Sequence, residues 1–232
     1  MKAPLAHRAV AEFVGTLLLL AAVVGSGIMG ERLATGNVAL ALLANSVATG
    51  CALVAILLAF GPISGAHLNP TVTLADAWGK GLPWRETPVY IVAQLAGAFA
   101  GVALANMMFG IPAFTPSTHV RAGAGQLLGE CVATFGLLST IWGSVRYRPS
   151  SVPFAVGAYI TAAYWFTSST SFANPAVTVA RSMTDTFSGI RPADVTGFIL
   201  AQAAGASMAT AVFLWLAPTA VRGPAPEPLD PS

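Results

Sequence analysis

Apolar residues run through the chain in long blocks, separated by short links that are polar or rich in Gly and Pro. Most of the blocks are close to the roughly 20 residues that cross the hydrocarbon core of a bilayer. They predict helices over 9–29, 37–60, 89–109, 123–145, 152–167 and 193–217, with the second helix ending at Gly61-Pro62. The pattern therefore predicts an all-α membrane protein with six transmembrane helices.

Two shorter apolar blocks, 70–79 and 175–185, each follow an Asn-Pro pair. Asn is a good helix cap, and Pro suits the first helical position because its missing N–H costs nothing there. About ten residues make roughly 15 Å of helix, half of a 30 Å core. Such half-helices are tolerated in a membrane where their ends line a cavity. We expect two re-entrant half-helices and a path across the bilayer.

The chain also repeats itself. The matched segments are Ala11–Thr16 with Gly129–Thr134, Asn69-Pro70 with Asn174-Pro175, and Ala93–Ala98 with Ala201–Ala206. Each repeat holds three spans and one half-span, so the number of crossings is odd and the two repeats have opposite orientations. This predicts a single channel domain over 1–222 with inverted repeats at about 8–110 and 123–217, and a functional site near the midplane. The Pro-rich tail, 223–232, is predicted to be disordered.

Composition agrees with a membrane protein. The chain has 232 residues, of which 55% are hydrophobic and only 9% charged, and its mean hydropathy is +0.71. Soluble domains usually carry about a quarter charged residues, and a net charge of +2 gives no reason to expect nucleic acid. Most Lys and Arg residues fall on the side of the N-terminus. This predicts cytoplasmic N- and C-termini in the cell (inner) membrane.

No enzyme signature is present in the sequence. We find no phosphate-binding Gly-Lys-Ser/Thr loop, no metal-spaced His/Cys cluster and no nucleophile with a base. We therefore expect no enzyme activity, no cofactor and no metal.

The residues around the Asn-Pro pairs resemble those of the aquaporin, or major intrinsic protein, family. The likeness is carried by Ser64–Pro70 and Asn174-Pro175-Ala176, together with Glu12 and Glu130, and it covers about 8–217. The resemblance implies a homotetramer with one pore per subunit, in which small neutral solutes pass where the half-helices meet. The central pore motifs would be Asn69, Pro70, Thr71, Asn174, Pro175 and Ala176.

The half-helices explain physically how such a pore works. Each presents its positive end, and an Asn amide donor, to the middle of the path. A hydroxyl or water accepts hydrogen bonds there, whereas a cation is repelled. The simpler alternative is that Asn69 and Asn174 are only helix caps. Thr71 adds a hydroxyl that either tunes the central donors or merely packs.

Selectivity is where the sequence departs from water-selective members of the family. By spacing from the two asparagines, the filter positions are Thr49, Ala162, Ser171 and Val177. This ring is small and uncharged, so it should admit glycerol, urea or an undissociated metalloid acid. The chain is most similar to bacterial aquaglyceroporins associated with arsenic resistance, which implies arsenite and methylated arsenicals as solutes. The alternative is a plain glycerol/water facilitator.

Four ionisable residues lie in or beside the apolar regions. For each of them a structural and a functional interpretation can be compared. Glu12 and Glu130 either accept hydrogen bonds from the loops before the half-helices or couple a transporter to protons. We favour loop bracing, and we assign His67 the same role. Arg181, four residues after Val177, either adds charge at the outer mouth or pairs with Asp185.

Overall fold

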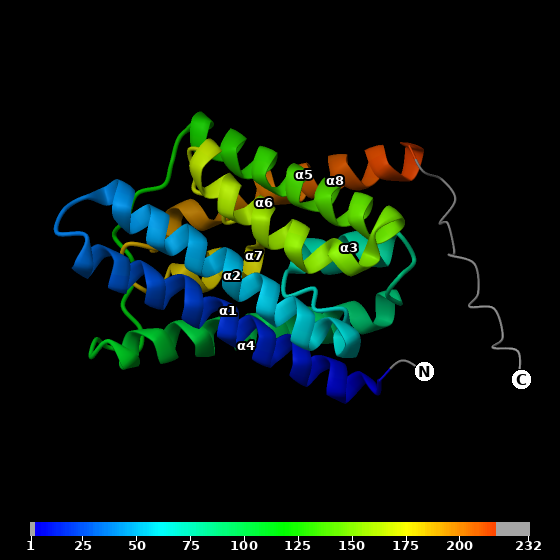
Figure 1. Cartoon of the computed structure of the whole chain (residues 1–232), viewed down its shortest axis with the longest axis horizontal. Helices are drawn as coiled ribbons and strands as arrows, with labels where there is room; N and C mark the ends of the chain where they lie inside the picture. Colours follow the sequence, from blue (N-terminus) through cyan, green and yellow to red (C-terminus); the bar gives the residue numbers. More distant parts are fainter. Residues whose placement is uncertain (1–2, 217–232) are drawn as a thin grey trace, which may run out of the picture.

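In the computed structural model, which describes residues 3–216, the chain is a bundle of helices without a strand (Figure 1). The helices are α1 Leu5–Leu33, α2 Val38–Ser64, α3 Pro70–Trp78, α4 Thr87–Met108, α5 Ala124–Tyr147, α6 Val152–Phe166, α7 Pro175–Arg181 and α8 Val195–Leu216. Short 3-10 turns occupy Trp84–Glu86, Pro149–Ser151 and Pro192–Asp194. The predicted tail, 223–232, lies outside the described residues.

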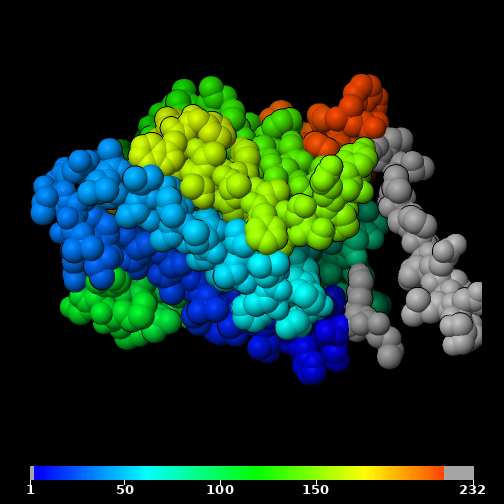
Figure 2. All heavy atoms as spheres, viewed as in Figure 1, coloured from blue at the N-terminus to red at the C-terminus, as the bar shows by residue number. Residues whose placement is uncertain are grey.

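Five helices in the described range are long and apolar enough to cross a membrane: α1, α2, α4, α5 and α8. The sixth predicted span is α6, which has 15 residues and is shorter than these five helices. It packs between α2 and α5, so it belongs to the same bundle. Figure 2 shows α1, α2, α5 and α6 side by side along one face of the molecule.

Several boundaries differ from the sequence predictions. The first long helix spans Leu5–Leu33 and not 9–29. The second long helix does not end at Gly61-Pro62 but continues to Ser64, where Gly65 adopts a φ of 91°. Pro62 lies in the last turn, where its missing N–H removes only one hydrogen bond. The second half-helix ends at Arg181 and not at residue 185. Beyond it the N–H of Ser182 bonds to the carbonyl of Val179, which tightens the last turn.

The two halves of the chain pack in the same way. In the first half α1 contacts α2 and α4, and in the second half α5 contacts α6 and α8. Close approach depends on glycine at matched positions. A Cβ added to Gly97 would lie 2.3 Å from the carbonyl oxygen of Phe13, and one added to Gly205 would lie 2.2 Å from that of Cys131. Helices in membranes use small residues in this way to bring their backbones together.

The half-helices α3 and α7 are held between the two halves, in contact with each other and with α4 and α8. We call the end of the bundle where α1 begins the N-terminal end, and the other the far end. The chain enters the bundle after α2, turns, and leaves along α3 toward the N-terminal end (Figure 1). α7 leads to the far end, so the two helices diverge from a common point inside the bundle.

Candidate pore between the half-helices

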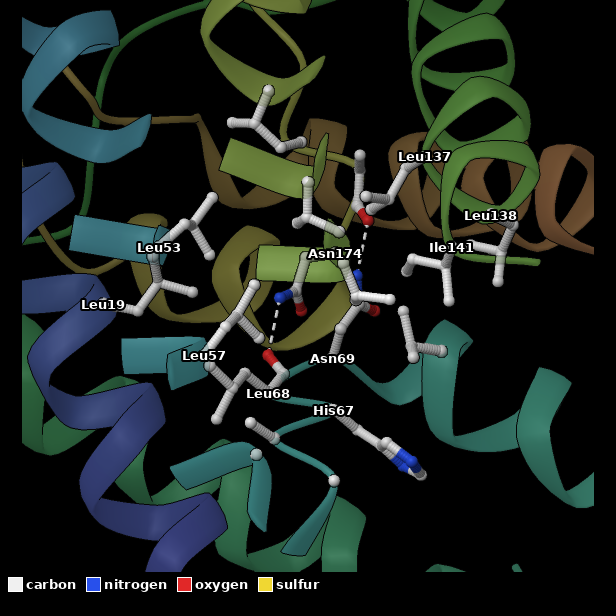
Figure 3. Close-up of a pocket in the computed structure, with 18 of the residues that line it drawn as sticks. Leu19, Leu53, Leu57, His67, Leu68, Asn69, Leu137, Leu138, Ile141 and Asn174 are labelled. Carbon is white, nitrogen blue, oxygen red and sulfur yellow. Dashed lines mark hydrogen bonds between the residues drawn. The ribbon is translucent and has the colours of Figure 1, made fainter. Parts of the chain in front are cut away.

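Asn69 and Asn174 lie at the facing N-termini of α3 and α7 (Figure 3). Each caps its own helix. The side-chain oxygen of Asn69 accepts a hydrogen bond from the N–H of Thr71 at 2.9 Å, and that of Asn174 accepts one from the N–H of Ala176 at 3.0 Å. Pro70 and Pro175 occupy the first helical positions. The capping chemistry expected from the sequence is therefore present at both half-helices.

The amide nitrogens of these asparagines cross between the halves. Asn69 Nδ2 donates to the carbonyl of Ala173 at 2.7 Å, and Asn174 Nδ2 donates to the carbonyl of Leu68 at 2.8 Å (Figure 3). A primary amide has two N–H donors, and neither asparagine has a second acceptor among the described residues. Both side chains line the central cavity. Each can thus cap a helix, join the halves and still offer one donor to a solute.

Thr71 and Ala176 occupy equivalent positions but differ in chemistry. The hydroxyl of Thr71 donates to Asn69 Oδ1 at 2.8 Å. Thr71 is buried and does not line the central cavity; it lines a separate small pocket beside α8. Its hydroxyl therefore contacts Asn69 without itself reaching the central cavity. Ala176 is buried and has no such bond to offer to Asn174.

Glu12 and Glu130 are completely buried and serve the loops that precede the half-helices. Glu12 accepts hydrogen bonds from four donors: His67 N at 2.9 Å, Leu68 N at 2.7 Å, Ser64 Oγ at 2.7 Å and Gln94 Nε2 at 2.8 Å. Glu130 accepts from Phe172 N at 2.8 Å, Ala173 N at 2.9 Å and Gln202 Nε2 at 2.6 Å.

These bonds hold an unusual backbone in place. Leu68 and Ala173 have φ values of 52° and 48°, in the left-handed region that non-glycine residues avoid. In this conformation their carbonyls accept the crossed asparagine bonds. Neither carboxylate forms an ion pair among the described residues. The arrangement suits loop bracing, and no acidic or basic side chain among the described residues bonds to either carboxylate.

His67 braces the first loop and also lines the cavity toward the N-terminal end. Its Nδ1 lies 3.2 Å from the hydroxyl of Thr73, and its Nε2 lies 3.6 Å from Asp76 Oδ2. The ring also contacts Tyr90, with 5.3 Å between ring centroids. Nothing equivalent surrounds the second loop in the described structure.

The central cavity has a volume of about 700 Å³ and is lined by residues from both halves. Apolar side chains such as Leu19, Leu53 and Leu137 line it on both sides of the two asparagines (Figure 3). Polar groups occur at three levels: His67 and Asp76 toward the N-terminal end, the two asparagines in the middle, and a polar group of residues toward the far end. The far group comprises Thr49, Tyr164, Ser171 and Arg181. A path with apolar walls and spaced donors suits small solutes that have both carbon and hydroxyl surfaces.

Three of the four predicted filter residues line this cavity together: Thr49, Ser171 and Val177. The fourth, Ala162, does not line the cavity and is an exposed residue of α6. This corrects the prediction made from spacing. The residues of α6 that line the cavity recur every four positions, at Val152, Val156, Ile160 and Tyr164. A residue two positions from this stripe points to the opposite side of a helix.

Tyr164 thus takes the place that the sequence analysis assigned to Ala162. Its hydroxyl donates to Thr49 Oγ1 at 3.3 Å, which ties α6 to α2 at the far end of the cavity. The expectation that only small side chains surround the constriction is therefore not met, because one large aromatic residue is present. The periodicity of α6 contained this signal, whereas counting back from Asn174 through an irregular loop did not.

Arg181 turns inward. It is only 2% exposed, its Nε donates to the carbonyl of Ser188, and its guanidinium carbon lies 3.5 Å from the centroid of the Phe172 ring. The alternative pairing with Asp185 does not form. Asp185 instead accepts a hydrogen bond from the backbone N–H of Thr118 at 2.8 Å, which holds the pKa of this carboxyl below its ordinary value. Phe172 lines the cavity as well and was not anticipated from the sequence.

These features define a helical membrane protein built around a central channel. Comparison with known proteins agrees. The family model described as "Major intrinsic protein" matches residues 1–170. Aquaglyceroporin AqpS of Rhizobium meliloti (strain 1021) is 55% identical over 212 residues, which are 91% of each chain. Aquaporin TIP1-2 of Zea mays is 34% identical over 186 residues, covering 74% of this chain and 72% of that one.

A solved structure shares the fold. The X-ray structure of the aquaglyceroporin from Plasmodium falciparum matches with a TM-score of 0.70 at 22% identity, over 92% of this chain and 95% of that one. The chain belongs to the major intrinsic protein family. It is a passive membrane channel and not an enzyme.

Proposed function

We propose that the channel conducts small uncharged solutes with hydroxyl groups, namely glycerol and undissociated trivalent arsenicals such as arsenite and methylated arsenicals, with or without water. The observation that carries this proposal is the central cavity of about 700 Å³, in which apolar side chains line a path with polar groups at three levels. A solute such as glycerol places its carbon atoms against the wall and its hydroxyls toward Asn69 and Asn174. A strongly hydrated ion finds no such replacement for its water shell.

At the far end of the cavity, which Tyr164 and Arg181 also line, the small residue at position 177 favours solutes larger than water. Val177 contributes a small apolar side chain there, beside Thr49 and Ser171, and no charged group extends from position 177 itself. The relative AqpS is named an aquaglyceroporin, which favours the same solute class. Glycerol and undissociated arsenite are both neutral and both carry three hydroxyl groups. The arsenical part of the proposal therefore rests on resemblance, and a plain glycerol/water facilitator is the alternative.

A proton-coupled transporter is the less favoured reading. Glu12 and Glu130 bond to the backbone of the two loops, so cycles of protonation would break the loops themselves. We also place the protein in the inner membrane as a homotetramer, with the N-terminal end in the cytoplasm. The excess of Lys and Arg on that side supports the orientation.

The test uses purified protein in liposomes and stopped-flow light scattering, with gradients of water, glycerol and arsenite. We expect wild type to pass glycerol and arsenite without a proton gradient and in the presence of an uncoupler. In Val177→Arg the guanidinium narrows the constriction, so both solutes should slow by about tenfold or more relative to water. Val177→Leu adds bulk without charge, so the flux of both solutes through it should lie between the fluxes through wild type and Val177→Arg.

Each outcome separates the candidates. Passage of glycerol without arsenite would leave the plain facilitator. Passage of water alone would refute the wide constriction, and flux that needs a proton gradient would refute the channel mechanism. Chemical crosslinking of the same sample, read by mass, tests the homotetramer.

A further inference from the structure

Arg181 places a guanidinium group in the wall of the cavity at its far end. The side chain lines the cavity although the residue as a whole is 2% exposed. Within residues 3–216 its Nε alone has an acceptor, the carbonyl of Ser188. The two terminal NH2 groups have no acceptor among the described residues, and neither is among the buried polar atoms that lack a partner. They are therefore open to the cavity.

No carboxylate forms an ion pair with this guanidinium among the described residues; the nearest electrostatic influence of a carboxylate is that of the buried Glu130. Arg181 takes part in none of the ion pairs found among the described residues. Asp185, the acidic residue nearest in sequence, is bound to Thr118, and Asp194 pairs with Arg191. Arginine stays protonated in proteins, so the far end of the cavity carries a fixed positive charge.

An aromatic ring holds Arg181 in position, and a second guanidinium lies over the same ring. Phe172 stacks on Arg181 and packs edge-on against Phe198, with 5.2 Å between ring centroids. The guanidinium carbon of Arg121 lies 5.0 Å from the same Phe172 ring. Arg121 does not line the cavity and is anchored to the backbone, most closely by the carbonyl of Gly189 at 2.7 Å. It therefore adds positive potential without blocking the path.

We propose that Arg181 is a specificity-determining residue of this channel, which repels cations at the far end and recognises pairs of oxygen atoms on neutral solutes. The inference rests on the proposed function and deepens it. A guanidinium presents parallel N–H donors that match two oxygens of one solute, as in a diol or a metalloid acid. A charge of the same sign as the permeant raises its energy most where little water screens it. The solute class is therefore neutral and polyhydroxylated.

Urea and the guanidinium ion offer a sharp pair of probes because they have nearly the same planar shape and differ in charge. Flux of each is measured in liposomes with wild type, Arg181→Gln and Arg181→Lys. Arg32→Met is the matched control. Arg32 also lies over a phenylalanine ring and donates to a backbone carbonyl at the far end, but it is exposed and outside the cavity.

We expect wild type to pass urea and exclude guanidinium, and Arg32→Met to behave as wild type. Arg181→Gln removes the charge but keeps an N–H donor, so the ratio of guanidinium to urea flux should rise at least about tenfold. Arg181→Lys keeps the charge without the paired donors. It should stay closed to guanidinium while the preference for glycerol over urea falls severalfold.

Three results would overturn the proposal: free passage of guanidinium through wild type, exclusion by Arg181→Gln equal to that of Arg32→Met, or an unchanged glycerol preference in Arg181→Lys. The first needs no variant, so the test stands even where a substitution impairs folding. A wild-type protein that passes no neutral solute at all contradicts the proposed function instead.

Discussion

The loops that lead into α3 and α7 are held by the same set of hydrogen bonds, which we call the frame, but different side chains lie around it. In both, a buried glutamate accepts two consecutive backbone N–H groups. A glutamine from a neighbouring helix joins that glutamate to the Thr four residues after the motif asparagine, Thr73 or Thr178. In both, an asparagine bonds across to the other loop. The frame is thus repeated almost atom for atom.

The surroundings of the frame are not repeated. The first loop faces His67, Asp76 and the ion pair of Arg8 with Glu86. The second faces Phe172 with two guanidinium groups and no paired carboxylate. The difference separates two tasks. Residues that hold the backbone are the same in both halves, because both half-helices need the same support, whereas residues that meet the solute are specific to each mouth.

Replacing the buried glutamates by alanine should have the largest effect on the stability of the protein. Glu12→Ala and Glu130→Ala each leave two buried N–H groups without an acceptor, at about 1–3 kcal/mol per group. Glu12 also accepts from Ser64, so its loss should destabilise more than that of Glu130. Thermal unfolding in detergent, followed by tryptophan fluorescence, measures both. Equal stability of the two variants would show that the extra hydroxyl bond does not matter, and wild-type stability in either would refute bracing.

Replacing the matched glycines by alanine should have the next largest effect on stability. Gly97→Ala and Gly205→Ala push a methyl group into a backbone carbonyl of the neighbouring helix, which overpacking experiments place at about 1–3 kcal/mol. Because the two contacts correspond, we expect nearly equal falls in melting temperature. Gly61→Ala is the control, since its Cβ would meet nothing within 4 Å. A large difference between Gly97→Ala and Gly205→Ala would mean that the halves are not equally packed.

The smallest effect is expected at the point where the frame itself differs. Thr71→Ala removes the hydroxyl bond to Asn69 Oδ1 and makes the first motif like the second, at a cost of about 1 kcal/mol. Asn69 keeps its cap from the N–H of Thr71, which the backbone provides in any residue. Melting temperature and glycerol flux are measured together. A strong loss of flux would show that the hydroxyl tunes the central donor and does more than pack.

The sequence predicts most of the frame, because local chemistry determines it. The starts of both half-helices, at Pro70 and Pro175, follow from capping by Asn69 and Asn174. The all-helical fold follows from the apolar blocks and is confirmed by the structure and by the family match. Loop bracing by the buried glutamates is a reading of the sequence that the hydrogen bonds support.

The parts that the sequence does not predict depend on tertiary arrangement. The misplacement of Ala162 arises because 167–174 is an irregular loop, in which Thr170, Ser171 and Ala173 have positive φ, so residue spacing does not measure helix rotation. The inward turn of Arg181 depends on Phe172 and on the carbonyl of Ser188. Phe172 in turn packs against Phe198 of α8, so the surroundings of Arg181 come from segments apart in the sequence.

The crossed asparagine bonds also set an order of events during synthesis. The atoms they join are 104 and 106 residues apart in the chain. At about 5–20 residues per second, the first loop is made roughly 5–20 s before its acceptor and donor in the second loop emerge. For that interval Asn69 and Leu68 lack their crossed partners. The finished first half is therefore an incomplete unit, and the second loop supplies both missing partners at once.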